Sequence, residues 1–134
     1  MRVRILGAIV LSMAAASAHA QSTRVTGVAG YLSEWAFSGN LSGSAAADEF
    51  SGSVTWKHVG LCTHNGPEEK SGDMTLQISR AGPVPQIHAM LVLDGARCEF
   101  SGPLSDKSTG QMNCPEAKSV PATLDINLDR TGGR

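Results

Sequence analysis

Apolar and polar side chains alternate along much of the chain, which is the pattern of β-strands that are buried on one face only. The alternation marks residues 31–41, 49–58, 74–79 and 124–128. The apolar residues that share a parity in these segments are Tyr31, Trp35, Phe37 and Leu41, then Phe50, Val54 and Trp56, then Met74, Leu76 and Ile78, and last Leu124, Ile126 and Leu128. We expect each segment to place these side chains on the buried face of a sheet.

Residues 86–93 carry apolar side chains on both parities, because Met90 and Val92 lie opposite Ile87, Ala89, Leu91 and Leu93. This strand is expected to be covered on both faces or to face a partner. Asp94-Gly95 follows at once, and Asp-Gly between apolar runs predicts a two-residue hairpin turn. A new strand then starts at Ala96, in which Cys98, Phe100 and Leu104 share a parity.

The rest of the chain predicts short strands and turns and no helix. Ser105–Gly110 has the composition of a polar turn, Met112 and Cys114 open a short strand, and Pro115–Pro121 forms a connector. About seven to eight strands joined by short turns predict an all-β antiparallel meander. We expect it to close into a small β-barrel, with a β-sandwich as the alternative, because open edges invite aggregation.

Phe-Ser-Gly recurs at 37–39, 50–52 and 100–102, each time inside a predicted strand. Phenylalanine and glycine then share a face, and a glycine beside a bulky side chain suits a place where a sheet bends. We interpret the repeat as a device of barrel curvature.

The N-terminal residues indicate the compartment to which the protein is sent. Arg2 and Arg4 precede the apolar stretch Ile5–Ala16, and Ala18-His19-Ala20 has the small-x-small pattern of a cleavage site. Residues 1–20 are predicted to be a secretory signal peptide, and residues 21–134 a single β domain with a core at about 30–129 and a loose tail at 130–134. The expected location is the periplasm or the exterior of a bacterial cell.

The formal net charge is −1, and removing the two signal arginines leaves a more acidic domain. The other basic residues form no cluster, which argues against nucleic acid as a partner. No further apolar run is long enough to span a membrane.

Disulfides are the default for cysteines in an oxidising compartment. Cys98 and Cys114 fall on neighbouring predicted strands with the same inward parity, so this pair is the first choice, and closing the loop stabilises by about 3 kcal/mol. Cys62 is then a leftover thiol. The pairs Cys62–Cys98 and Cys62–Cys114 remain alternatives, because spacing does not fix connectivity.

Two kinds of chemistry are alternatives to simple binding. His58, Cys62 and His64 share a face if their segment stays extended, which makes them weak candidate metal ligands. A bulge at Gly60 would destroy this shared parity. His88 is a general base only if it lies near Ser79 or Ser101, and the chain lacks a Gly-x-Ser-x-Gly elbow. The neighbouring carboxylates of Glu68 and Glu69 fit a solvated loop.

The favoured function is a non-catalytic binding or interaction domain of the bacterial envelope, with no cofactor. Its partner is expected to be a small apolar ligand or an envelope protein, and Trp35, Trp56 and Met90 are the predicted ligand-binding residues. Small barrels with an early tryptophan and a cysteine pair also include protease inhibitors. A protease-inhibitor-like role or a small hydrolytic enzyme is therefore a further alternative, and only the analogy of architecture supports it.

Overall fold

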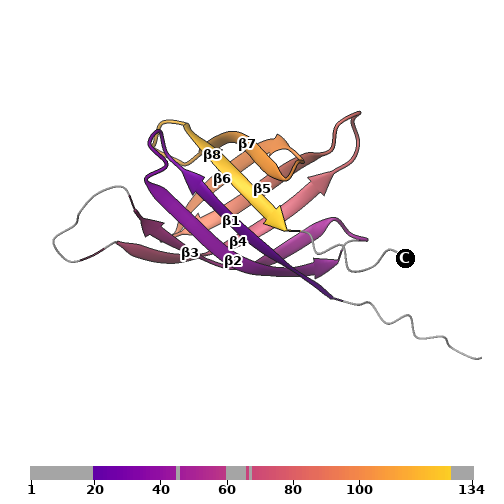
Figure 1. Ribbon diagram of the computed structural model, residues 1–134, viewed down its shortest axis with the longest axis horizontal. Coiled ribbons are helices and arrows are strands. Elements are labelled where there is room, and N and C mark those ends of the chain that lie inside the picture. Colours follow the sequence, from indigo (N-terminus) through magenta and orange to yellow (C-terminus); the bar gives the residue numbers. More distant parts are fainter. Residues whose placement is uncertain (1–19, 45, 60–65, 67, 128–134) are drawn as a thin grey trace, which may run out of the picture.

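The computed structural model of the 134-residue chain describes residues 20–44, 46–59, 66 and 68–127. Its strands are β1 (Gln21–Ala29), β2 (Trp35–Ser44), β3 (Glu49–His58), β4 (Glu69–Ser79), β5 (Gln86–Leu93), β6 (Ala96–Pro103), β7 (Lys107–Asn113) and β8 (Val120–Asn127). Each strand pairs antiparallel with the next, and β8 pairs with β1, so the sheet closes into a barrel (Figure 1). The predicted meander and its closure into a barrel are confirmed. The β-sandwich alternative is wrong, because closure leaves one continuous sheet.

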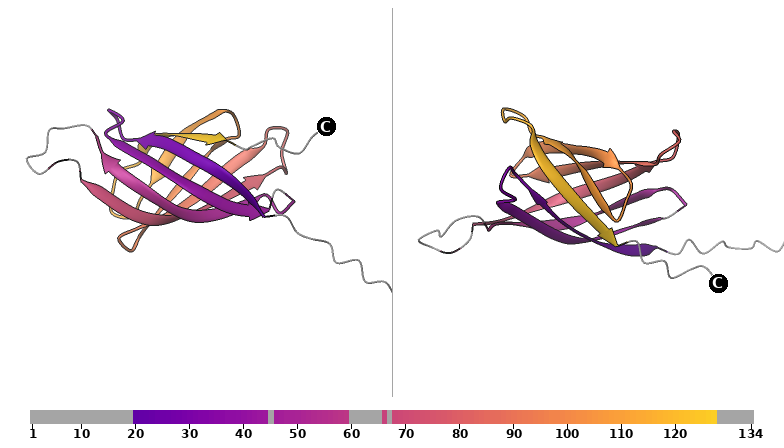
Figure 2. Two further views of the ribbon diagram at one scale, coloured as in Figure 1. Left: turned by 60° about the horizontal axis from the view of Figure 1, so that its bottom comes forward. Right: turned by 45° about the horizontal axis from the view of Figure 1, so that its top comes forward.

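The barrel wall is a single layer of tilted strands, as the two views of Figure 2 show. The described part of the chain contains no helix that could cross a membrane. Of the predicted signal peptide only Ala20 belongs to the described residues, and Leu128 and the predicted tail lie outside them.

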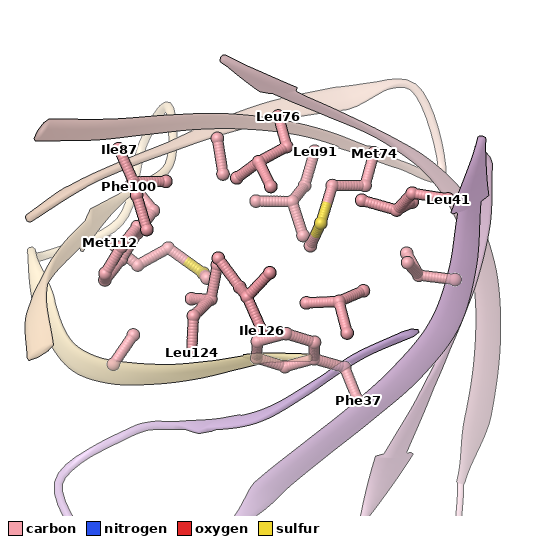
Figure 3. Close-up of a cluster of buried hydrophobic side chains, with 14 of the residues drawn as sticks. Phe37, Leu41, Met74, Leu76, Ile87, Leu91, Phe100, Met112, Leu124 and Ile126 are labelled. Atoms are coloured by element: carbon pink, nitrogen blue, oxygen red, sulfur yellow. The ribbon is translucent and has the colours of Figure 1, made fainter. Parts of the chain in front are cut away.

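Alternate side chains of every strand fill the barrel interior. Leu76 of β4, Leu91 of β5 and Leu124 of β8 are fully buried and point into the barrel together (Figure 3). Each fully buried side chain of this size stabilises the fold by about 1.5–3 kcal/mol. The remaining core includes Val25, Phe37, Leu41, Phe50, Val54, Trp56, Met74, Ile78, Ile87, Phe100, Met112 and Ile126. In strands β2 to β6 and β8, the buried side chains are therefore those of the parity that the sequence predicts.

Glycines lie where the backbone of a neighbouring strand comes close. A Cβ at Gly52 would lie 2.4 Å from the carbonyl oxygen of Asn40, and one at Gly102 would lie 2.7 Å from that of Thr109. No larger residue fits without moving backbone, so these glycines permit the close approach. This geometry supports the interpretation of the Phe-Ser-Gly repeats as a device of curvature.

The first strand, β1, was not expected, and the barrel begins at Gln21 instead of near residue 30. Two of its inward positions carry no large apolar side chain. Thr23 is buried, and its hydroxyl donates to the carbonyl of Asn127. At Gly27 a Cβ would lie 2.3 Å from the Phe37 ring, so Phe37 fills the space that a side chain here would need. The alternation of apolar and polar residues is therefore incomplete in β1.

The prediction that Tyr31 belongs to a strand is wrong. The chain turns between β1 and β2, with positive φ values at Gly30 and Ser33, and β2 starts only at Trp35. Tyr31 is 71% exposed, and its hydroxyl donates to the carbonyl of Ser119 at 3.1 Å. Its contact thus ties this turn to the connector before β8.

The expected polar turn at Ser105–Gly110 is also wrong in part, because β7 already starts at Lys107. The inward residues of β7 are Ser108, Gly110 and Met112, of which only the last is apolar and large. A Cβ at Gly110 would lie 3.1 Å from the Phe100 ring of β6. Phe100 thus takes up interior space next to β7, and the strand shows no apolar alternation of its own.

The hairpin between β5 and β6 is confirmed at the predicted turn. Asp94 and Gly95 have φ values of 48° and 79°, and Leu93 pairs with Ala96. Positive φ at both central residues is the geometry for which Asp-Gly is favoured. This turn brings the end of β5 and the start of β6 to the same end of the barrel.

Candidate functional site

A cavity of about 390 Å³ opens at one end of the barrel. The ends of β1, β3, β5 and β7 and the starts of β2, β4, β6 and β8 lie at this end, which we call the mouth. The nonpolar part of the lining consists of Ala29, Gly30, Trp35, Trp56, Leu93, Ala96, Cys98, Met112, Cys114 and Val120. Charged side chains at the rim are Glu34, Lys70 and Asp94.

Three of the strands carry small inward-facing residues near the mouth, which leaves room for the hollow between the larger side chains. Ala29 ends β1, Ala96 begins β6 and Val120 begins β8. Deeper in the barrel the same three strands carry larger inward residues, such as Phe100 and Leu124. Close packing therefore fills the barrel middle and leaves space at the mouth.

Trp35 and Trp56, two of the three predicted ligand-binding residues, lie together at this cavity. Trp56 of β3 is 3% exposed and stacks on Phe37 with ring centroids 4.4 Å apart. Trp35 of β2 is half-buried and meets the His58 ring edge-on, with centroids 4.7 Å apart. The register explains the arrangement, because Trp35 pairs with His58 and Phe37 pairs with Trp56.

The indole N–H of Trp56 has no hydrogen-bond partner in the part of the chain that the structure describes. Among the described residues it is the only buried side-chain nitrogen or oxygen in this condition. A buried donor left without an acceptor costs about 1–3 kcal/mol.

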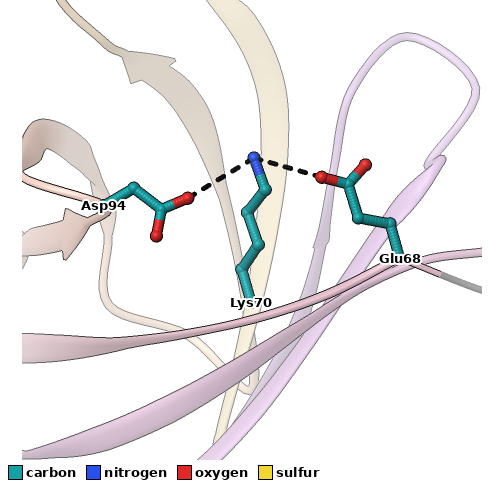
Figure 4. Close-up of polar contacts among 3 residues, drawn as sticks. All are labelled: Glu68, Lys70 and Asp94. Carbon is teal, nitrogen blue, oxygen red and sulfur yellow. Dashed lines mark ion pairs between the residues drawn. The ribbon is translucent and has the colours of Figure 1, made fainter.

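Lys70 extends from β4 between two carboxylates at the rim (Figure 4). Its Nζ lies 3.3 Å from Glu68 and 3.6 Å from Asp94, and 5.6 Å from the centre of the Trp35 ring. Glu68 and Asp94 are exposed and Lys70 is half-buried, so each ion pair contributes at most about 1 kcal/mol to stability. Their main effect is to set the charge at the mouth.

The Cys98–Cys114 disulfide forms part of the cavity wall, as the sequence predicts for this pair. The Cα atoms are 4.2 Å apart. The ladder between β6 and β7 holds only the pairs Glu99–Asn113, Phe100–Met112 and Ser101–Gln111, the shortest ladder of the barrel. Continuing that register by one pair places Cys98 opposite Cys114. The disulfide therefore extends the short β6–β7 ladder toward the mouth.

Met90, the third predicted ligand-binding residue, is not at the mouth. It faces outward from β5 and is 36% exposed, on the side opposite to the buried Ala89 and Leu91. Val92 lies on the same outer face. The parity of the strand is the physical reason, since a residue that alternates with core positions points away from the interior.

The structure brings His88 and Ser101 together, with Nδ1 and Oγ 3.0 Å apart. They are directly opposite on β5 and β6, on the outer face of the sheet, beside a hollow of about 350 Å³. Both are exposed, and in the described part of the chain no carboxylate is hydrogen-bonded to His88. Ser79, the other predicted partner, ends β4 and pairs with Gln86.

Of the predicted metal ligands, only His58 belongs to the described residues, while Cys62 and His64 lie outside them. No group of three His, Cys, Asp or Glu side chains suited to a metal ion occurs in the ranges that the structure describes. Glu68 and Glu69 each face a lysine. Glu68 pairs with Lys70, and Glu69 pairs with Lys57 at 3.6 Å.

The fold and this site define a small closed β-barrel with a largely nonpolar cavity at one mouth. No protein-family model, curated protein or solved structure matches the chain.

Proposed function

We propose that this protein is a non-catalytic binding domain that takes a small, largely apolar molecule into the mouth of the barrel. The observation that carries the proposal is the position of the cavity. Both tryptophans line it, while deeper in the barrel the interior holds the buried apolar core. Apolar pockets with a few polar groups are the usual form of a small-molecule site.

Other candidate chemistry lies elsewhere. The His88–Ser101 pair is on the outer face, away from the cavity and open to water. The ring of His58 packs against Trp35, which is a structural contact. A periplasmic or secreted location remains part of the proposal and rests on residues 1–20 of the sequence.

Tryptophan fluorescence tests the proposal directly, because the chain has two tryptophans and both line the cavity. The probe is N-phenyl-1-naphthylamine, an uncharged apolar dye whose emission rises in apolar surroundings. We expect saturable binding, with energy transfer from tryptophan to the bound dye.

A matched pair of variants locates the site. Val120→Phe fills the mouth, and we expect it to weaken dye binding by about tenfold or more, since the added ring occupies the cavity. Val84→Phe places the same change in the exposed β4–β5 connection at the opposite end, and is expected to bind like the parent. Equal binding by both variants, or no binding by the parent chain, would reject a ligand site at the mouth.

A further inference from the structure

The three most exposed large apolar side chains of the described residues all lie at the mouth. Leu32 is 89% exposed, Tyr31 71% and Val59 56%. Tyr31 and Leu32 belong to the turn between β1 and β2, and Val59 directly follows β3. The backbone N–H of Val59 donates to the carbonyl of Glu34 at 2.7 Å, so the end of β3 lies beside this turn. We call Tyr31, Leu32 and Val59 the apolar tip.

The turn that carries Leu32 satisfies polar groups of its own backbone. The N–H of Leu32 donates to the carboxylate of Glu34 at 2.9 Å. The N–H of Ser33 donates to the carbonyl of Gly30 at 3.2 Å. A donor that is already bonded within the protein loses little when water leaves it, whereas an unpaired donor is costly in an apolar medium. The leucine at this turn is therefore suited to enter an apolar phase.

A lipid bilayer fits the apolar tip better than a protein partner does. Three side chains present far less surface than the roughly 800 Å² per partner of a standard protein interface. A bilayer needs no matching pocket, and tyrosine rings are typical of its headgroup level, with leucine reaching the acyl chains. Attraction to anionic headgroups is not required, because the Lys70 ammonium at this end is already shared by Glu68 and Asp94.

The apolar tip is also continuous with the cavity. Gly30 and Glu34, which flank Tyr31 and Leu32 in the sequence, both line the cavity, and Trp35 comes next. Apolar surface thus extends from the tip into the interior of the barrel. Resting on the proposed binding function, we infer that the apolar tip docks the mouth on an uncharged lipid bilayer. The apolar ligand then passes between the acyl chains and the cavity without entering water, in which it is poorly solvated.

Co-sedimentation with sucrose-loaded phosphatidylcholine vesicles tests the docking. The protein used begins at Gln21, which keeps all eight strands and omits the apolar stretch of the predicted signal. We expect weak, reversible binding by the parent. Leu32→Ser should lower the partition coefficient about tenfold, as expected when one leucine no longer leaves water. Val84→Ser is the matched change in the exposed β4–β5 connection at the opposite end, and should bind like the parent.

Transfer of bound N-phenyl-1-naphthylamine to the same vesicles tests the passage of the ligand. We expect the rate of transfer to rise with vesicle concentration for the parent and for Val84→Ser, and to be several-fold slower for Leu32→Ser. Without vesicles the three proteins should bind the dye alike, because neither Leu32 nor Val84 lines the cavity.

The outcomes separate the docking from the proposed function. If the dye binds but the parent does not sediment with phosphatidylcholine vesicles, the mouth is a ligand site and the docking is wrong. Binding only to vesicles that contain phosphatidylglycerol, or equal binding by Leu32→Ser and the parent, overturns the role of the apolar tip. A dimer of the parent that Leu32→Ser abolishes in lipid-free solution overturns it as well, since the tip then contacts a second copy. If the vesicles bind and no dye does, the docking holds and the proposed ligand site is wrong.

Discussion

Reduction of the Cys98–Cys114 disulfide should lower the stability of the barrel more than removal of any single surface contact. The two cysteines are 16 residues apart in the sequence, and closing a loop of this length stabilises by about 3 kcal/mol in the chain-entropy model. The seam that the bond closes has the shortest ladder in the barrel. A change of about 3 kcal/mol corresponds to a fall in Tm of about 10–20 °C for a domain of this size.

The assay is thermal unfolding followed by circular dichroism, with and without a phosphine reductant at fixed protein concentration. Dye binding, measured below the transition, should also weaken, because both cysteines line the cavity. Cys62→Ser is the control, and this variant should keep the full response to reductant. A fall in Tm of less than about 3 °C on complete reduction would refute the argument from loop closure. Loss of the response in Cys62→Ser would show that the bond involves Cys62.

Three further predictions test other parts of the structure. Gly110→Ala should lower the free energy of unfolding in urea by more than about 1 kcal/mol, because its Cβ would lie 2.1 Å from the carbonyl oxygen of Ser101. Gly82→Ala, whose Cβ has no neighbour closer than 3.9 Å, should change it by less than about 0.5 kcal/mol, and equal effects would contradict the packing argument. Lys70→Met should cost at most about 2 kcal/mol in the same assay, since it removes two ion pairs whose carboxylates are exposed, and a larger loss would show that the rim charges support the fold. Mass spectrometry of the exported protein should give a chain that begins at Gln21, and a retained N-terminus would refute the signal peptide.

The strands that the sequence predicts are those whose inward positions are themselves large and apolar. In β3, for example, Phe50, Val54 and Trp56 mark the buried face without help from other strands. The inward positions of β1 and β7 include Thr23, Gly27, Ser108 and Gly110, which carry little local signal. Large side chains on the neighbouring strands occupy that space. Such strands become visible only once the pairing of the whole barrel is known.

The candidate site, like the strands, was predictable only where a local pattern of apolar residues marks it. Trp35 and Trp56 share a parity with core positions of their own strands, which is enough to place both inside. Met90 has the opposite parity to the core positions of its strand. The apolar residues on both faces of that strand suggested a ligand-binding role, but the closed barrel places Met90 on its outer surface. The missing partner of the Trp56 N–H depends on contacts from several strands. No local pattern reports it.

The position of Trp56 connects stability with the proposed function. Phe37 covers one face of the indole, and the small residues Ala29, Ala96 and Val120 near the mouth leave room beside it. A phenylalanine could fill much of the same apolar space without burying a donor, whereas the indole carries a penalty of about 1–3 kcal/mol in the free protein. Departures from full satisfaction of buried polar groups are expected mainly at functional sites. The Trp56 N–H therefore weakens the free barrel at the end where we propose that a ligand binds.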